Sequence, residues 1–410
     1  MAEGITTRDR QSRSGTYAAF AIQGLCFASL VTQVPKIQDT HHLSDGTLSL
    51  VLLMVPVIAG VGSVLSGGLF ARVGSGPVLR IAQPLVCATI ILVGLTGDND
   101  PALYASVALF GLFVGAVDAS MNAQAVAVER RYGVSLITGF YAVWSVAGIL
   151  GGLWASLANK LDLSLLTGFA IAASAGIIVS LATGHLVYRK DEESAGAPSA
   201  ADLKAAGRSV PWKPILIVGA AMATFYLADA AISSYGTKYL EDELSSADWV
   251  GPLGYVAYQV AMVFSRTVAD FGVRRSGPVQ VVRIGSVVGL VGMIGVVAAP
   301  NAWVAIPAFA VAGLGLSVVA PISYTAAGRV DPTGLGVAVA RVNVFNYVGF
   351  VLGAAVIGAI APVSDSNGLR LAFIVPTVLV VLIYATAKGF NPRPVPGART
   401  DTPVAERPTV

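Results

Sequence analysis

Apolar residues run along most of the chain in long blocks, which short clusters of charged residues, Gly and Pro separate. Each block is roughly 20 residues long, and a helix of that length crosses the hydrocarbon core of a bilayer. The pattern therefore predicts an all-α integral membrane protein with twelve transmembrane helices. The first six are predicted at 15–34, 47–70, 77–96, 102–127, 136–158 and 163–188, and the second six at 214–236, 247–268, 278–299, 302–327, 334–361 and 369–389.

The composition agrees with a chain that lies mostly in lipid. Of the 410 residues, 55% are hydrophobic and 12% are charged, about half the charge of an ordinary soluble domain. So few charges do not cover a soluble surface of that size. The net charge of +3 is small and spread along the chain, so no nucleic-acid partner is expected.

Polar segments divide the chain into five parts. Arg8, Arg10 and Arg13 precede an apolar block as in a secretory signal, but no small-residue cleavage site follows, so we expect an uncleaved first helix. Charged and small residues at 189–213 are typical of a linker, and a tail rich in Pro and Thr has nothing to bury and is expected to be disordered. The expected parts are a cytoplasmic N-terminus 1–14, a six-helix bundle 15–188, the linker 189–213, a second six-helix bundle 214–389 and the tail 390–410.

Lys and Arg fall mainly on one side of the predicted membrane. With the N-terminus inside, the outer side keeps only four of the 26 basic residues, namely Lys36, Lys160, Lys238 and Arg370. Cytoplasmic loops are enriched in Lys and Arg. We therefore expect a multi-pass protein of the bacterial inner membrane with both termini in the cytoplasm.

The two halves repeat one another. Ser75-Gly76-Pro77-Val78 recurs as Ser276-Gly277-Pro278-Val279, an offset of 201 residues. Gly148 and Gly152 match Gly349 and Gly353 at the same offset, and Gly111-Leu112 matches Gly313-Leu314 at 202. Two six-helix halves related by a parallel repeat are a transporter architecture with its site between the halves.

The loop after the second predicted helix resembles a motif of the major facilitator superfamily, and the resemblance covers roughly residues 15–389. The motif reads Gly-x-x-x-Asp-Arg-x-Gly, and here Gly67 is followed by Ala71-Arg72-Val73-Gly74, so its acid is replaced. The equivalent stretch from Arg266 to Gly277 keeps its charges. The resemblance implies gating contacts, and the residues that match are Arg72, Asp270 and Arg274.

Within that superfamily the chain resembles bacterial permeases related to the fucose permease. The fourth predicted helix holds Asp118-Ala119-Ser120-Met121-Asn122, similar to the acid-x-x-x-Asn signature of that group, and Asn346-Tyr347-Val348-Gly349-Phe350 is similar to its eleventh helix. The chain departs from the group at Gln23, where the fucose permease has an acid. The glycine motif with proline that marks drug antiporters is missing, since Gly148-Ile149-Leu150-Gly151-Gly152 has no Pro.

Two acids lie within predicted helices, where an ionised carboxylate is costly and marks a functional hypothesis. Asp118 and Asn122 are four residues apart and share a helix face. Asp118 is therefore a candidate proton or substrate site, the alternative being a structural hydrogen bond to a neighbouring helix. Asp229 lies nearer the outer end, where it is either a second proton site or an acid reached by water.

Other polar residues within the helices fit a central cavity for a small polar solute. Amides and aromatic rings together suit sugar-like ligands, which need partners for hydroxyl groups and a flat apolar surface for stacking. The same residue types also bond helices to one another and anchor them at interfaces. The candidate ligand contacts are Gln23, Asn122, Tyr141, Trp144, Tyr258, Gln259, Tyr324, Asn343 and Asn346.

No cofactor or metal site is indicated. His41 and His42 are adjacent, lack a third ligand and are expected in a solvated outer loop, and Cys26 and Cys87 are expected as small core residues. A membrane enzyme would need a nucleophile with a base, or a metal cluster, and no His accompanies Asp118 or Asp229. A sensor normally carries an added signalling domain, for which the linker and tail leave no room.

The sequence therefore predicts a proton-coupled permease, not an enzyme, that moves a small sugar-like solute across the bilayer by alternating access. Its expected partners are the solute, the proton and lipid, and it is expected to act as a monomer. Export of an antibiotic or another metabolite by proton antiport is the alternative, because one fold serves both directions.

Overall fold

The computed structural model describes residues 5–134, 136–196, 199–331, 336–364 and 367–391. The predicted disordered tail lies, from residue 392 on, outside the described residues. The longer helices of the first half are α1 (Thr7–Val31), α3 (Asp45–Val73), α4 (Ser75–Leu95), α5 (Asp100–Tyr132), α6 (Ile137–Lys160) and α7 (Leu165–Thr183). Those of the second half are α10 (Trp212–Lys238), α11 (Gly251–Ser276), α12 (Pro278–Ala298), α13 (Ala302–Leu316), α14 (Val319–Arg329), α15 (Val337–Ile360) and α16 (Gly368–Thr386).

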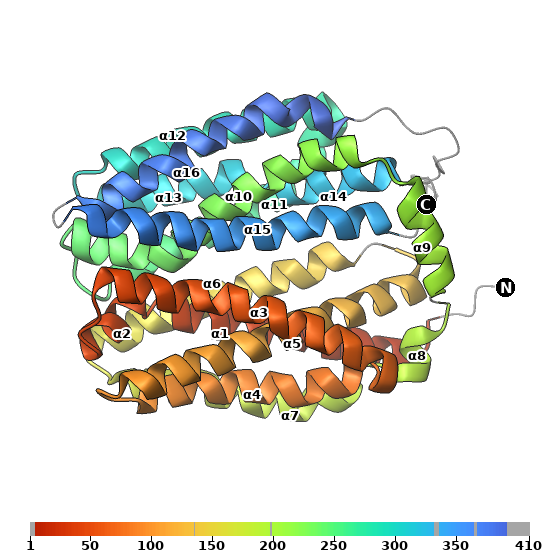
Figure 1. Cartoon of the computed structure of the whole chain (residues 1–410), viewed down its shortest axis with the longest axis horizontal. Coiled ribbons are helices and arrows are strands. Elements are labelled where there is room, and N and C mark those ends of the chain that lie inside the picture. Colours follow the sequence, from red (N-terminus) through yellow and green to blue (C-terminus); the bar gives the residue numbers. More distant parts are fainter. Residues whose placement is uncertain (1–4, 135, 197–198, 332–335, 365–366, 392–410) are drawn as a thin grey trace, which may run out of the picture.

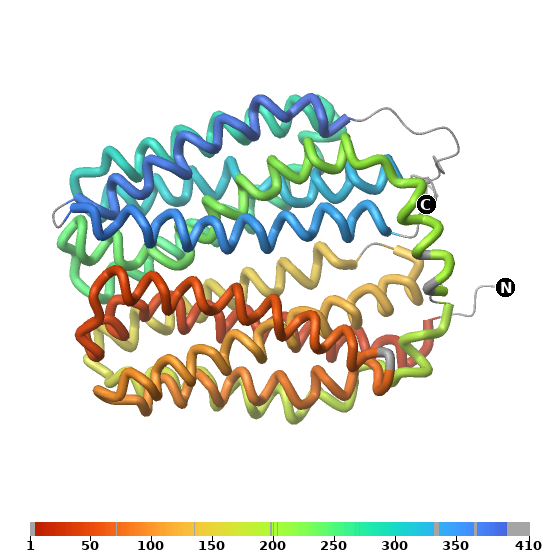
Figure 2. The backbone as a smooth tube through the Cα atoms, in the orientation of Figure 1, coloured from red at the N-terminus to blue at the C-terminus, as the bar shows by residue number. Residues whose placement is uncertain are grey.

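These helices form two bundles, one above the other in Figure 1 and each with its own hydrophobic core. Figure 2 shows the backbone running lengthwise back and forth through each bundle. The short helices α8 (Lys190–Ser194) and α9 (Ala200–Ser209) connect the bundles at one end, here called the linker end, and α2 (Val34–Thr40) lies at the opposite, far end. The predicted fold class, twelve membrane helices in two six-helix halves, is confirmed.

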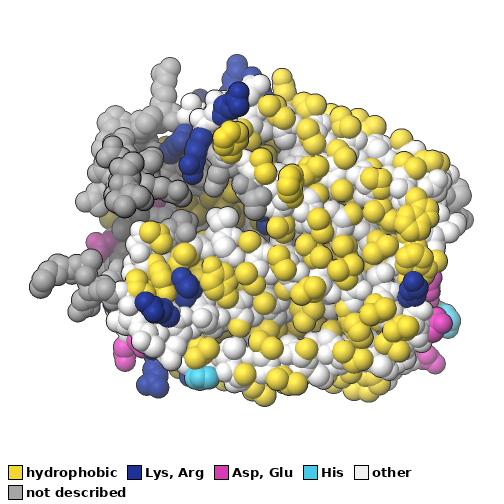
Figure 3. Space-filling model, turned by 180° about the vertical axis from the view of Figure 1, so that it is seen from behind, with side chains coloured by type: hydrophobic (Ala, Val, Ile, Leu, Met, Phe, Trp, Pro, Cys, Tyr) yellow, Lys and Arg dark blue, Asp and Glu magenta, His cyan; other side chains and the backbone are white. Residues whose placement is uncertain are grey.

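The surface suits a bilayer. Hydrophobic side chains cover its middle, and charged side chains gather towards the two ends (Figure 3). Eleven of the described helical segments are long and apolar enough to cross a membrane. The remaining long helix, α11, falls short because it carries polar residues such as Tyr255, Gln259 and Arg266, yet it packs lengthwise between α6 and α13.

Several helices are longer than predicted. α1 begins at Thr7 instead of residue 15, because Thr6 and Asp9 cap each other's backbone N–H groups. α11 continues to Ser276 instead of residue 268 and ends where Gly277 takes a left-handed φ of 78°. The extension places Arg266 well inside the helix, instead of two residues from its predicted end.

The tenth predicted helix is broken into α13 and α14. Pro321 lies in the first turn of α14 and has no N–H with which to bond the carbonyl of Ser317, so a continuous helix is not stable across this point. The equivalent α5 has no such proline and runs unbroken.

The residue offset between equivalent positions of the two halves differs in the structure from the offset of the sequence matches. Gly74 and Gly277 cap α4 and α12 with φ of 83° and 78°, so these two are equivalent, and the recurring Ser-Gly-Pro-Val lies at different places in the two turns. A Cβ on Gly151 would meet Ala28 Cβ at 2.9 Å, and one on Gly353 would meet Ala230 Cβ at 2.8 Å. Gly151, not Gly152, is therefore the counterpart of Gly353, at an offset of 202.

The structure corrects the prediction for one His residue and adds a contact to the prediction for the two Cys residues. His41 is buried, with Nδ1 at 2.9 Å from Asp100 Oδ1 and Nε2 at 2.8 Å from Thr96 Oγ1, so it joins α2 to the start of α5 and is not solvated. Cys26 and Cys87 are free and buried as expected, but their sulfur atoms lie 3.4 Å apart, a contact between α1 and α4 that their spacing did not reveal.

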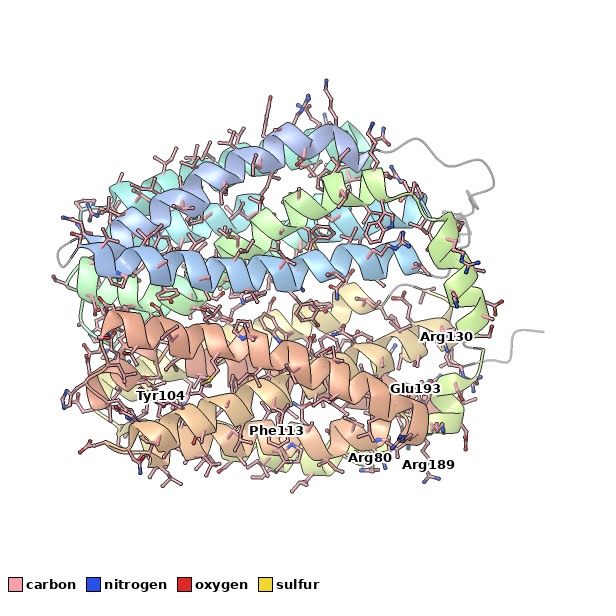
Figure 4. The ribbon with its side chains drawn as sticks, viewed as in Figure 1. Arg80, Tyr104, Phe113, Arg130, Arg189 and Glu193 are labelled. Atoms are coloured by element: carbon pink, nitrogen blue, oxygen red, sulfur yellow. The ribbon has the colours of Figure 1, made fainter. Side chains whose placement is uncertain are left out.

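The first part of the linker is docked on the first half. Arg8 of α1 donates from Nε and Nη2 to the two carboxylate oxygens of Glu192, at 2.7 Å each, and Tyr188 donates to Asp9 Oδ1 at 2.6 Å. Figure 4 shows Arg130 and Glu193 together beside α8, where Arg130 donates to the Glu193 carbonyl at 3.1 Å.

The second part of the linker is docked on the second half. Arg341 of α15 donates to the carbonyl oxygen of Val210 at 2.8 Å, and its guanidinium lies over the Trp212 ring. Each half therefore holds its own portion of the linker.

Candidate functional site

A cavity of about 220 Å³ lies between the two bundles. Helices α1, α3, α5 and α6 of the first half and α10, α11 and α15 of the second contribute to its walls. Its far-end part is apolar, lined by residues such as Val34, Ile37 and Leu48. Acids, amides and aromatic rings gather in the part nearer the middle of the helices.

The position of Asp118 shows how deep this polar region is. Asp118 follows the start of α5 by 18 residues and precedes its end by 14, which is roughly 27 Å and 21 Å along a helix. The carboxylate therefore lies near the middle of the molecule. A bilayer that matched the apolar belt would place it far from water on both sides.

Residues from both halves hold Asp118. Tyr347 of α15 donates to Asp118 Oδ2 at 2.6 Å, which is a contact from one half to the other. Asn122, one turn along α5, donates to Asp118 Oδ1 at 3.2 Å, and Tyr141 of α6 donates to the Asn122 side-chain oxygen at 3.0 Å. The carboxylate thus accepts from a hydroxyl and an amide, and no Lys or Arg of the described residues lies within 4 Å of it.

Asp229 lies on the cavity wall in α10. Tyr258 of α11 donates to Asp229 Oδ1 at 2.8 Å. Asp229 follows the start of α10 by 17 residues and lies 9 residues before Lys238 at its end, which is roughly 14 Å from that end. It therefore lies nearer the far end than Asp118, as predicted from the sequence.

Arg266 brings a positive charge into the same cavity. It lies 10 residues before the end of α11, roughly 15 Å along the helix. Its Nη1 donates to Ser145 Oγ of α6 at 3.4 Å, again between the halves. The predicted helix 247–268 included Arg266, but its charge was grouped with the loop motif that runs to Gly277, so it was not proposed as a cavity residue; its position inside a predicted helix was the signal that could have found it.

Comparison with known proteins gives the family. The sequence model of the Major Facilitator Superfamily matches residues 16–333. The chain belongs to this superfamily. It is 30% identical over 374 residues to an uncharacterized MFS-type transporter of Yersinia pestis, which covers 91% of this chain and 94% of the relative.

Two further matches have lower sequence identity. An uncharacterized transporter of Sinorhizobium fredii is 24% identical over 373 residues, which cover 91% of this chain and 96% of that transporter. Among solved structures, the nucleoside transporter NupG superimposes with a TM-score of 0.72 at 15% identity, covering 95% of this chain and 100% of that one. This last likeness concerns the fold.

Most of the predicted site residues of this superfamily member surround the cavity. Those that line it are Gln23, Asp118, Tyr141, Trp144, Asp229, Gln259 and Asn346. Asn122 and Tyr258 stand behind it and bond the two acids. Tyr324 and Asn343 are different, because they bond to each other at 2.8 Å and are not among the described residues that line the cavity.

Contacts between the halves lie at the far end, beside the apolar part of the cavity. Lys238, at the end of α10, is 4% exposed. It donates to Gln38 Oε1 of α2 at 2.6 Å and lies 3.2 Å from Asp45 Oδ1 of α3, while it also pairs with Asp242 of its own half. We call Lys238, Gln38 and Asp45 the far-end clasp.

The predicted gating residues lie at the other end. Arg72 and Arg274 are exposed in the last turns of α3 and α11, and Lys190 of the linker donates to the Arg72 carbonyl at 3.1 Å. The side chain of Asp270 lies outside the described residues. Lys238 was expected only as an outer basic residue, and nothing in the sequence indicated that it joins α10 to α2 and α3.

Proposed function

We propose that this chain is a proton-coupled secondary transporter that carries a small polar solute through the central cavity by alternating access. The observation that supports it most is the hydrogen bond from Tyr347 to Asp118, because it links a carboxylate of one half to the other half. An ionised carboxylate accepts on both oxygens, whereas a protonated one has less acceptor capacity. Proton uptake by Asp118 would therefore weaken a contact that holds the halves together.

The far-end clasp supports the conformational part of the proposal. Ser156 of α6 also donates to the Trp249 carbonyl at 2.5 Å, and Asn159 donates to the Asp248 carbonyl at 3.0 Å. These bonds join the halves at the far end. We infer that the structure represents the state closed at the far end, and that transport requires the clasp to break as the bundles rock about the cavity.

The cavity wall supports a sugar-like solute. Trp144, Phe27 and Phe350 offer aromatic surface, and Gln23 and Asn346 offer amides, a combination that binds hydroxylated rings. The likeness to permeases related to the fucose permease and to a nucleoside transporter points the same way, since a nucleoside contains a sugar and a flat base.

The distribution of charge supports the placement in the membrane. We place the linker end in the cytoplasm of a bacterium, because the linker end carries most of the basic residues. Arg72, Arg274 and Asp270 are then proposed as contacts that form when the linker end closes. The protein works as a monomer in this proposal, with uptake as its direction.

The experiment has two steps. Purified protein is first screened against hexoses, nucleosides and antibiotics by thermal unfolding, because a ligand that binds the folded state raises the apparent Tm. Proteoliposomes are then offered the best labelled ligand with and without a proton gradient directed inwards. Accumulation that requires the gradient supports the proposal. Equal levels in both conditions contradict proton coupling, and loss of preloaded solute against its gradient would instead show export.

A further inference from the structure

The single basic side chain among the described residues that line the cavity, Arg266, forms no ion pair with an acid whose side chain the structure describes. The ion pairs of the described residues do not include it, and the one hydrogen bond from its side chain is the 3.4 Å contact with Ser145. Guanidinium carries five N–H donors and stays charged under all ordinary conditions. An arginine at this depth is costly unless something pairs with it.

The two acids of the cavity form no direct ion pair or hydrogen bond with Arg266. Asp118 accepts from Tyr347 and Asn122, and Asp229 accepts from Tyr258. Neither carboxylate comes within 4 Å of Arg266. The planar fork of the guanidinium matches a carboxylate with two parallel hydrogen bonds, and in this structure that fork faces the cavity with most of its donors unused.

Two further groups on the wall lack partners. Gln23 and Gln259 are 4% and 3% exposed and line the cavity. The side-chain oxygen of each is buried without a hydrogen-bond donor. Buried acceptors of this kind are costly. Each oxygen is closed off from the cavity in this state, and a rotation of the amide would bring it within reach of a hydroxyl group of the solute.

Resting on the proposed function, we propose that the transported solute is a small hydroxylated organic acid, whose carboxylate binds Arg266 and whose hydroxyl groups donate to Gln23 and Gln259. A sugar acid has both features. Trp144 and Phe27, whose rings lie 5.8 Å apart between centroids, supply the apolar surface beside it.

Charge balance connects this solute to the proton. Asp118, Asp229 and a bound carboxylate would place three negative charges around one arginine, which repel one another in a medium of low dielectric. Protonation of one aspartate reduces that repulsion. Solute and proton therefore favour each other's binding, and this is the reciprocal relation that symport requires.

The test uses matched pairs of neutral and acidic sugars as probes: glucose with gluconate and glucuronate, and galactose with galacturonate. Binding is measured by thermal unfolding and by competition, and transport is measured in proteoliposomes. The account predicts that an acid binds at least about tenfold more tightly than its neutral partner, and that the affinity for the acid rises as the pH falls.

Variants of Arg266 distinguish the loss of its charge from the loss of the folded state. Arg266→Gln should raise the KM for the acid by about tenfold or more, and Arg266→Lys should recover part of the loss. Arg283→Gln is the matched control, because Arg283 of α12 lies in the same half over the Tyr384 ring and does not line the cavity. Its KM should equal that of the wild type. Thermal unfolding of each purified variant shows that it is folded.

The results that would overturn the inference differ from those that would overturn the proposed function. A wild-type protein that transports a neutral hexose with the pH gradient, and binds none of the acids, keeps the proposed function and overturns the inference. An unchanged KM for the acid in Arg266→Gln also overturns the inference. If the protein transports an acid at a rate that does not depend on the pH gradient, and the affinity for that acid depends on Arg266, the inference stands and proton coupling is contradicted.

Discussion

Tyr141 and Asn343 occupy equivalent positions in the two halves, 202 residues apart. Each belongs to a Tyr–Asn hydrogen bond that joins equivalent positions of its own half, but the tyrosine and the asparagine have exchanged places. Tyr141 of α6 donates to Asn122 of α5 at 3.0 Å, and Tyr324 of α14 donates to Asn343 of α15 at 2.8 Å. Asn122 and Tyr324 are also 202 residues apart. The first pair lies beside Asp118, whereas the position equivalent to Asp118 in the second half is Ala320, so one copy of the bond supports an acid and the other copy does not.

This relationship predicts different effects for two matched variants. Tyr324→Phe should lower the stability by about 1 kcal/mol, because it leaves the Asn343 oxygen unpaired, and should leave the affinity for the solute unchanged. Tyr141→Phe removes the equivalent hydroxyl group. Because Tyr141 lines the cavity, this variant should also weaken solute binding. Tm and binding constants for both variants check this, and a Tyr324→Phe protein with weakened binding would contradict the assignment.

Removing the hydroxyl that joins the halves at the site should alter the conformational equilibrium. Tyr347→Phe keeps the ring and deletes the donor to Asp118 Oδ2, so the state seen here loses a contact between halves. We expect faster exchange between states and weaker dependence on pH. Counterflow rates at several pH values measure this, with Tyr324→Phe as the control that removes a Tyr–Asn bond within one half. Identical pH profiles for Tyr347→Phe and the wild type would argue against the role of this bond.

The far-end clasp predicts a change in accessibility. Lys238→Gln removes the charge that faces Asp45, so the far end should open more often. A cysteine placed at Ser234, which lines the cavity, should then react several-fold faster with an impermeant thiol reagent from the far side. Lys36→Gln is the control, because Lys36 donates to the Leu163 carbonyl within the first half. Equal labelling rates in the two variants would show that Lys238 does not close the cavity.

The docked linker predicts a dependence on pH. The hydrogen bonds from Arg8 hold the pKa of Glu192 below its usual range. A lowered pKa stabilises the folded state above the ordinary value of about 4.3, and this stabilisation is lost as the pH falls through the lowered value. Wild type should therefore exceed Glu192→Gln in Tm at neutral pH, and the difference should close below about pH 4. Asp191→Asn, in the same turn and exposed, is the control, and a difference that persists at low pH would contradict the account.

The sequence predicted the helices and the acids better than the contacts between halves. The thickness of the bilayer sets the length of the hydrophobic blocks, so the helices are easy to recognise in the sequence. An acid inside such a block is equally easy to recognise. Asp118 and Asn122 were found together because their bond depends on the helix period alone. Tyr347 was noted within the stretch that resembles the eleventh helix of the family. Its bond to Asp118 joins residues 229 apart in sequence, and no local pattern reveals such a pair.

Arg266 and Lys238 were misjudged for a related reason. Arg266 lay within the predicted helix 247–268, but its charge was grouped with the loop motif that follows, and its bond to Ser145 of the other half is not visible in any local pattern. Lys238 looked like an ordinary basic residue at a helix end. Its partners Gln38 and Asp45 come from the other half, so only the packed structure shows that it joins the two.

The central claim, that Asp118 couples the proton to the solute, is tested most directly by Asp118→Asn. The variant keeps the shape of the side chain and one acceptor oxygen, as in a protonated carboxyl group, but removes the titration. Uptake of the identified solute is measured in proteoliposomes with and without an imposed pH gradient, with Asp98→Asn, an exposed loop variant, as the control. The account predicts that Asp118→Asn still binds the solute and exchanges it down a gradient but no longer accumulates it. Accumulation against the gradient at the wild-type rate would contradict the account and make Asp118 a structural residue.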